Sequence, residues 1–296
     1  MTARTWTGAE SNNAADPNNW TPTGIPQPGE TLTMTGGTMD IRGQILAGDT
    51  LTIGQLATPV TATLNLSHHA TATMDVLSGI PTGVAGVDVT VNVKGSDTLN
   101  FHEEYISGTK LTVNLADHAT LTGSVGAEYI SDLTMTGGPG SRYANISGGA
   151  GGAAAVYDVD VVGTGQFSAT PAQSLGGVLE FGRSVSQGQT VKVGGNNGQG
   201  VTSYLKVDHP HQFAGSVALQ TFGEVDLQGL ANADSYTYQN DMLSLYSGNK
   251  VIDVLRLTLP PPVGNDIPLS VSRTSTGIAV DRDYVPSSYT PLPMHG

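Results

Sequence analysis

The sequence predicts an all-β protein folded as a right-handed parallel β-helix, or β-solenoid. Three observations support this fold class. Short runs that alternate apolar and polar residues recur along most of the chain, and no segment longer than about 12 residues keeps a helical apolar period. Similar strings also return at intervals of roughly two dozen residues. A unit of that length fits one solenoid coil, which buries its apolar side chains only against neighbouring coils.

The alternating runs are the candidate strands. They are rich in β-branched residues and are bounded by Gly, Asn, Asp or Pro, as expected of strands with one buried face. The best helix candidate is 234–245, although its Ser, Thr and Tyr content makes it weak. The clearest runs are 32–34, 64–66, 89–93, 111–115, 133–135, 159–161, 191–193, 217–219, 225–227 and 269–271.

One repeated string fixes the position of a polar row. LNLSHHAT at 64–71 returns as VNLADHAT at 113–120, with VNVKGSDT at 91–98 between them. The asparagines that these three strings share are Asn65, Asn92 and Asn114. In stacked coils they form a row on the polar side of a strand. Two interpretations are open, a surface that binds something flat and a solvated face with a structural role, and we favour the second.

Two further repeats give a similar unit length. EYIS occurs at 104–107 and again at 128–131, an offset of 24, and LTMTGG occurs at 32–37 and 133–138, an offset of 101. The larger offset is close to four coils. We therefore expect each pair of strings to occupy equivalent places in the stack.

Composition limits the classes of partner. Hydrophobic residues make up 38% of the chain, enough for a core, but only 12% are charged, about half the usual share in soluble domains. The 12 basic and 25 acidic residues give a net charge of −13, so we expect no nucleic-acid partner, which would require Lys and Arg clusters. No cofactor is expected, although acidic residues in Gly-rich turns leave calcium as a candidate.

The absence of cysteine excludes disulfides, thiolate metal sites and a cysteine nucleophile. Large bacterial surface proteins often lack disulfides, and this favours an extracellular or bacterial cell-surface location. No apolar stretch has the length of roughly 18 residues that a membrane span requires, so none is expected. The N-terminal segment contains no apolar core of a conventional leader either.

The segment 1–30 differs from the rest of the chain and contains both tryptophans, Trp6 and Trp20. The phrases WTG, NNW and PQPGE in this segment resemble the start of passenger domains in autotransporter-like bacterial surface proteins, with Glu30 where Asp is usual. The resemblance implies an N-terminal cap, since an open solenoid end must be covered. A carbohydrate-stacking platform is the alternative role for the two rings.

The stretch 213–257 is similar to the terminal coils of secreted bacterial repeat proteins. It contains an aromatic-Gly phrase, then VDL, then a Gly-Asn turn followed by KVIDVLRL. This resemblance implies an extracellular location and brings no catalytic motif.

We predict three regions: a cap at 1–30, a solenoid at 31–258 with a Gly/Ala-rich break at 137–155, and a C-terminal hairpin and extended tail at 259–296. The hairpin would pair 267–271 with 277–280. The tail is either a loose end or a strand that docks onto the next subunit by adding to an exposed sheet edge. The candidate assembly residues are Trp6, Trp20, Pro260, Tyr284 and Tyr289.

We do not expect an enzyme, because acid–base and metal motifs are sparse. Asp158 and Asp160 are the best carboxylate pair for glycoside hydrolysis, but a solvated strand face or a calcium-binding edge explains them equally well. The histidine-containing candidates for a metal site could equally be polar turns, and no metal ligand is assigned. They are His68, His69, His118, the segment His102–Glu104 and the segment Asp208–His211.

The sequence therefore predicts a secreted bacterial structural protein of the cell surface or biofilm matrix. It would act by adhesion and by self-association into oligomers or fibres, joined head to tail or through its tail. Two alternatives stay open: a carbohydrate-binding adhesin that recognises a surface polysaccharide, and a polysaccharide-degrading β-helix enzyme.

Overall fold

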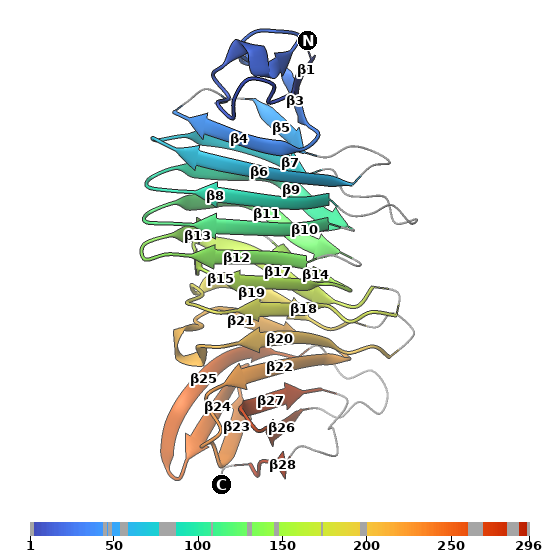
Figure 1. The fold of residues 1–296 in the computed structure, drawn as a ribbon. Coiled ribbons are helices and arrows are strands. Elements are labelled where there is room, and N and C mark those ends of the chain that lie inside the picture. The colour runs from blue at the N-terminus through green and yellow to red at the C-terminus, as the bar shows by residue number, and fades with distance from the viewer. Residues whose placement is uncertain are drawn as a thin grey trace. The chain divides into compact units, whose positions relative to one another are not determined.

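The computed structural model describes residues 3–43, 46, 49–53, 59–76, 87–107, 109–128, 132–144, 148–172, 174–195, 200–259, 269–282 and 290–294. Of the described residues, strands account for 62% and helices for 3%, and the parallel strands are stacked in coils, which confirms the predicted β-solenoid (Figure 1). Within these ranges the helical elements are the 3-10 turns η1 (Pro17–Asn19) and η2 (Pro210–Gln212). No helix in the described ranges is long and apolar enough to cross a bilayer.

The chain forms two compact units, 1–147 and 148–296, each with two sheets. In the first unit, sheet B1 contains parallel strands β4 (Gly37–Arg42), β6 (Val60–Ser67), β8 (Val87–Val93), β10 (Thr109–Leu115) and β12 (Asp132–Gly137). Sheet A1 contains β1 (Ala3–Trp6), β2 (Trp20–Thr21), β3 (Thr31–Met34), β5 (Thr50–Ile53), β7 (Thr71–Val76), β9 (Thr98–Ser107), β11 (Thr120–Glu128) and β13 (Arg142–Ala144).

Successive strands of the first unit alternate between its two sheets. In Figure 1 the chain runs along a B1 strand in front, turns, and returns along an A1 strand behind, which makes the coil right-handed. Alternate residues point inward, so that a row of buried side chains crosses B1 in register. This row, in which every side chain is 0% exposed, consists of Met39, Leu64, Val91, Val113 and Met135. Burying such a side chain stabilises the fold by roughly 1.5–3 kcal/mol.

The N-terminal segment covers the first coil. Trp6 and Trp20 are a pair across β1 and β2, with ring centroids 5.3 Å apart in an edge-to-face arrangement. Their exposed fractions are only 3% and 1%, and the indole Nε1 of Trp20 donates to the Ala14 carbonyl over 2.9 Å. Strand β1 then pairs in parallel with β3 and joins this segment to the coils. The rings therefore pack inside the cap and offer no exposed stacking platform.

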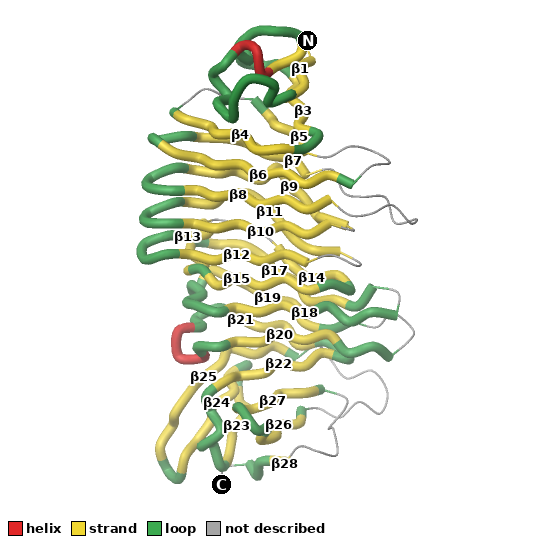
Figure 2. The backbone as a smooth tube through the Cα atoms, in the orientation of Figure 1, coloured by secondary structure: helices red, strands yellow, loops and turns green. Residues whose placement is uncertain are grey.

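In the second unit the coils are parallel until the C-terminal end, where antiparallel strands close both sheets (Figure 2). Sheet A2 contains β14 (Gly148–Gly151), β17 (Thr164–Thr170), β19 (Gly188–Val193), β21 (Ser216–Leu219), β25 (Lys250–Thr258), β24 (Met242–Ser247) and β23 (Ser235–Gln239). Sheet B2 contains β15 (Ala154–Asp158), β18 (Val178–Phe181), β20 (Ser203–Val207), β22 (Gly223–Gln228), β27 (Gly277–Asp281), β26 (Ser270–Arg273) and β28 (Thr290–Pro291), and the short β16 (Asp160–Val162) follows β15.

Aromatic rings fill the core of the second unit. Tyr157 packs against Phe181 with centroids 5.7 Å apart, and both contact Phe167 edge to face. Phe213 extends the cluster at 6.0 Å from Phe181. The predicted C-terminal hairpin is present as β26 and β27, in which Val271 pairs with Val280.

Three details differ from the sequence prediction. The helix candidate 234–245 lies in the antiparallel pair β23 and β24, joined by Asn240 and Asp241 with φ of 51° and 58°. Positive φ at both central residues is typical of a tight hairpin turn, and this turn breaks the apolar pattern that suggested a helix. The Gly/Ala-rich stretch 137–155 is not simply a break, because it contains β13, β14 and the start of β15.

In two of the repeats, EYIS and LTMTGG, the two copies of the string do not occupy equivalent places in the stack of coils. Glu104 pairs with Val125, three residues before the matching Glu128. The strings are 24 residues apart, whereas the paired strands have an offset of 22 residues up to Gly123 and of 21 after the bulge between Gly123 and Val125. The two LTMTGG strings begin on different sheets, one on β3 in A1 and one on β12 in B1. Strands of A1 and B1 both alternate apolar and polar residues, so a short string that recurs in the sequence does not show which sheet it belongs to.

Candidate functional site: the outward face of sheet B1

The outward face of B1 carries polar side chains in register across the coils. Residues two apart on a strand share a face, so each strand contributes one member to each of two rows. The Thr row consists of Thr38, Thr63, Thr90, Thr112 and Thr134, and the Asn row consists of Asp40, Asn65, Asn92, Asn114 and Thr136. Neighbouring strands are about 4.8 Å apart and the rows about 7 Å apart, as the spacing of a parallel sheet requires.

The Asn row is a continuous chain of side-chain hydrogen bonds. The Nδ2 of Asn65 donates to Asp40 Oδ1 over 2.8 Å, Asn92 Nδ2 to Asn65 Oδ1 over 2.8 Å, and Asn114 Nδ2 to Asn92 Oδ1 over 2.9 Å. Thr136 Oγ1 closes the row by donating to Asn114 Oδ1 over 2.9 Å. Each internal amide therefore uses one donor hydrogen and one oxygen lone pair within the row and has further hydrogen-bonding capacity. The row therefore links neighbouring strands of B1 through their side chains.

The Thr row is different, because its hydroxyls have no hydrogen-bond partner in the part of the chain that the structure describes. All five threonines are half-buried on the strand face, and within the described ranges none of their side-chain hydroxyls is hydrogen-bonded to another protein group. This row was not among the residues predicted from the sequence. The signal was present, because a threonine stands two residues before Asn65, Asn92 and Asn114.

A third outward row at the start of the same strands is exposed and of mixed charge. It consists of Thr61, Asp88, Lys110 and Asp132. The Thr and Asn rows contain only one ionisable group, Asp40, at one end. The centre of the face is thus an uncharged array of hydroxyl and amide groups on a rigid backbone.

The repeated histidine-containing turn lies at the end of these strands. His68 and His69 have positive φ, at 63° and 62°. His68 Nδ1 is 3.0 Å from Ser67 Oγ, and Ser96 Oγ is 2.7 Å from His69 Nδ1. His118 is exposed in the equivalent turn two coils later. The described residues contain no group of three or more His, Asp or Glu side chains that could hold a metal, and the side chains of 102–104 lie outside them.

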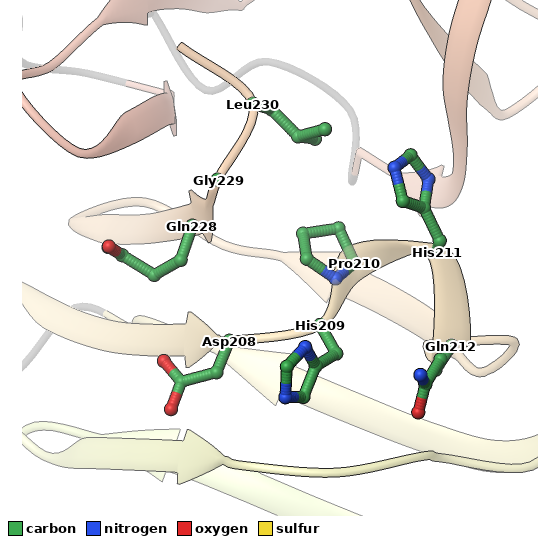
Figure 3. A pocket seen from close by; sticks show the side chains of 8 residues that line it. All are labelled: Asp208, His209, Pro210, His211, Gln212, Gln228, Gly229 and Leu230. Atoms are coloured by element: carbon green, nitrogen blue, oxygen red, sulfur yellow. The ribbon is translucent and has the colours of Figure 1, made fainter.

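The segment Asp208–His211 lines a depression of about 190 Å³, together with Gln212, Gln228, Gly229 and Leu230 (Figure 3). Its candidate ligands do not converge, because His211 points away from Asp208 and His209 in Figure 3. Asp208 instead accepts from Lys206 over 3.1 Å, and His211 Nδ1 is 3.3 Å from Asp253 Oδ1. This arrangement fits a polar turn better than a metal cage.

The outward face of B2 carries a row of charged residues that was not predicted from the sequence. Glu180, Lys206 and Asp226 are paired across β18, β20 and β22. Lys206 Nζ is 3.0 Å from Glu180 Oε1. Burial raises the pKa of Asp226, opposed by a 2.5 Å hydrogen bond from Gln228 and by the charge of Lys206.

The predicted carboxylate pair has separate partners. Asp158 Oδ1 accepts from Arg183 Nε over 3.0 Å, and Asp160 Oδ1 accepts from Ser184 Oγ over 2.5 Å. Of the candidate assembly residues, Trp6 and Trp20 are buried in the cap. Pro260, Tyr284 and Tyr289 lie outside the described residues, so their role stays a prediction.

Comparisons with protein families, with characterised proteins and with solved structures found no match to this chain.

Proposed function

We propose that this chain is a secreted bacterial structural protein of the cell surface or matrix, and that it adheres through the outward face of B1. The ligand class that fits this face is a neutral, hydroxyl-rich polymer such as a surface polysaccharide. One observation carries the proposal: a row of hydroxyls without a hydrogen-bond partner among the described residues lies beside a row of hydrogen-bonded amides, both at the regular spacing of a parallel sheet.

The two rows are organised before any ligand arrives. Except for Thr38, which follows the exposed Gly37, each polar residue stands between buried neighbours on its strand, for example Thr90 between Val89 and Val91. The Asn side chains are further held by their mutual bonds. Binding would therefore cost little side-chain entropy, and repeated weak contacts along a polymer would add up.

Charge supports a neutral ligand. The chain has a net charge of −13, which would repel an acidic polymer from the protein as a whole. The centre of the face presents groups that both donate and accept hydrogen bonds, as sugar hydroxyls do. The low charge density, the lack of cysteine and the resemblances of 1–30 and 213–257 to secreted bacterial proteins support the extracellular location.

The experiment is sedimentation of the protein with insoluble neutral and acidic polysaccharides. The test variant replaces Thr63, Thr90 and Thr112 with Val, which removes three hydroxyls and keeps the side-chain shape. The matched control replaces Thr31, Thr50 and Thr73 with Val, because these residues form an equivalent outward row on A1. We expect binding to a neutral polymer that the test variant loses and the control variant keeps.

Two results would count against the proposal. One is equal binding by wild type and the B1 variant when both have the same circular dichroism spectrum. The other is a lack of binding by wild type to every neutral polymer, combined with binding to an acidic one.

A further inference from the structure

The C-terminal end of the second unit is closed by a short segment that we call the closing tail, residues 290–294. It contains β28, which pairs with β26 through Ser272 opposite Pro291 and Arg273 opposite Thr290. The tail thus follows the last antiparallel strands of the chain.

The closing tail lies between the edges of two sheets. On one side Leu292 N donates to Val271 O over 2.8 Å, on β26. On the other side Tyr236 N donates to Pro293 O over 3.1 Å, and Met294 forms a bridge with Tyr236 on β23. The tail is therefore hydrogen-bonded both to the β26 edge of B2 and to the β23 edge of A2.

A single apolar side chain anchors the tail. Leu292 is 8% exposed, opposite Val271, which is 2% exposed, whereas Met294 is 67% exposed. A segment held by a few backbone hydrogen bonds and one buried side chain opens more readily than the coils that it covers. Once it opens, β26 and β23 present free edges, and such edges pair with any suitable extended strand.

We propose that the closing tail also docks in trans, in the slot between β26 and β23 of a second copy of this chain. A tail donated by a second copy would make the same backbone hydrogen bonds and bury the same leucine as the chain's own tail. Exchange of an identical element between copies is therefore a low-cost route to association. This inference is independent of the polysaccharide-binding face.

The geometry also sets the type of assembly. Each copy has one tail and one slot, and both belong to the same end of the molecule. Two copies that exchange tails satisfy both slots at once, which makes a closed symmetric pair. The expected product is a dimer, in place of the tail-mediated fibre expected from the sequence.

Light scattering after size-exclusion chromatography tests the proposal on the complete chain. We expect a dimer fraction that rises with protein concentration and incubation time. Leu292→Asp should abolish it by removing the anchor, and Met294→Asp, at an exposed position of the same tail, should preserve it. A wild-type chain that stays monomeric at every concentration would overturn the proposal, as would a dimer that survives Leu292→Asp.

Cysteine pairing then locates the contact, because the natural chain has no cysteine. Residues opposite each other on antiparallel strands are close enough for a disulfide. A mixture of Val271→Cys and Leu292→Cys chains with different tags should give an oxidised heterodimer. The control mixture pairs Leu292→Cys with Ser275→Cys, an exposed residue of the β26–β27 turn, and should not. Equal cross-linking in both mixtures would refute tail exchange as the cause of the dimer.

Discussion

The side-chain amide of Asn92 donates a hydrogen bond of 2.8 Å to that of Asn65, which is 27 residues earlier in the chain. Asn114, which follows Asn92 after only 22 residues, makes the same bond to it at 2.9 Å. Coils of different length therefore keep one register across B1, and the difference is taken up outside the paired strands. A row of side chains can remain regular even though the sequence repeat is not.

The hydrogen bonds of the Asn row predict that substitutions at two outward positions of β8 will lower the free energy of unfolding by different amounts. Replacing Asn92 with Ala removes two side-chain hydrogen bonds, each worth about 0.5–1.5 kcal/mol of net stability. We expect the free energy of unfolding to fall by about 1–3 kcal/mol. Thr90→Ala, two residues away in the row without such bonds, should change it by about 0.5 kcal/mol or less. Urea denaturation measures both, and equal losses would mean that the row does not stabilise the sheet.

Stability should depend on pH through a buried pair of carboxyls on β22 and β27. Glu224 and Asp281 are opposite each other and 5% and 3% exposed, and Arg282, also buried, is next in the chain. Burial first, and then the charge of Glu224 and a hydrogen bond with it, raise the pKa of Asp281 from 3.8 to about 8. The folded chain therefore keeps a proton that the unfolded chain releases, so stability falls as the pH rises from 3.8 to about 8.

Asp281→Asn tests this dependence because the amide cannot ionise. We expect the melting temperature of wild type to decrease between pH 5 and pH 8, with a flatter profile for the variant. Since β27 connects the parallel strand β22 to the antiparallel strand β26 in B2, amide hydrogen exchange in β27 should also quicken with pH beyond the intrinsic chemical effect. Parallel melting profiles for the two proteins would contradict the assignment.

The N-terminal cap can be followed separately from the rest of the protein. Both tryptophans of the chain lie in it, so their fluorescence reports only this segment. Trp20→Phe removes the hydrogen bond to Ala14 and part of the ring contact with Trp6. We expect the remaining Trp6 emission to shift to longer wavelength at lower urea than in wild type, before the loss of β-sheet circular dichroism. Trp6 emission that changes together with the circular dichroism would show that the cap does not open first.

Asp158 offers a test of the enzyme alternative. Its ion pair with Arg183 is partly exposed, with side-chain exposure of 45% and 33%, and pairs of this kind contribute about 0–1 kcal/mol. Asp158→Ala should therefore alter stability little, and we expect neither wild type nor variant to release reducing ends from polysaccharides. Release by wild type that the variant loses would establish catalysis and refute our proposal of a non-enzymatic protein.

The fold class could be predicted from the sequence because its signals are local. Alternation within strands, glycine-rich turns and the Asn65, Asn92 and Asn114 spacing each depend on short stretches of chain. The hairpin β23–β24 escaped prediction because its signal is two non-glycine residues with positive φ, Asn240 and Asp241. These residues interrupt an apolar pattern that otherwise resembles a weak helix.

The candidate site could be predicted only in part. The Asn row could be predicted from the repeat. Only the tertiary structure shows that the Thr hydroxyls have no hydrogen-bond partner among the described residues. The EYIS strings are 24 residues apart, whereas paired residues of β9 and β11 are 22 apart before the bulge next to Gly123 and 21 apart after it. A Cβ at Gly123, where φ is +88°, would lie 1.8 Å from the Phe101 carbonyl oxygen. This close approach between coils is not visible in either string alone.

The sequence by itself determined that the chain is all-β, that its strands stack in coils of roughly two dozen residues, and that asparagines recur on one face. Only the tertiary structure decided which sheet each strand joins, that the closing tail docks on its own chain, and that Glu224 faces Asp281. The physical reason is that strand patterning comes from neighbours along the chain. Register, edge closure and burial of charge depend on pairing between residues far apart in sequence, which many similar strands leave open until the whole stack has formed.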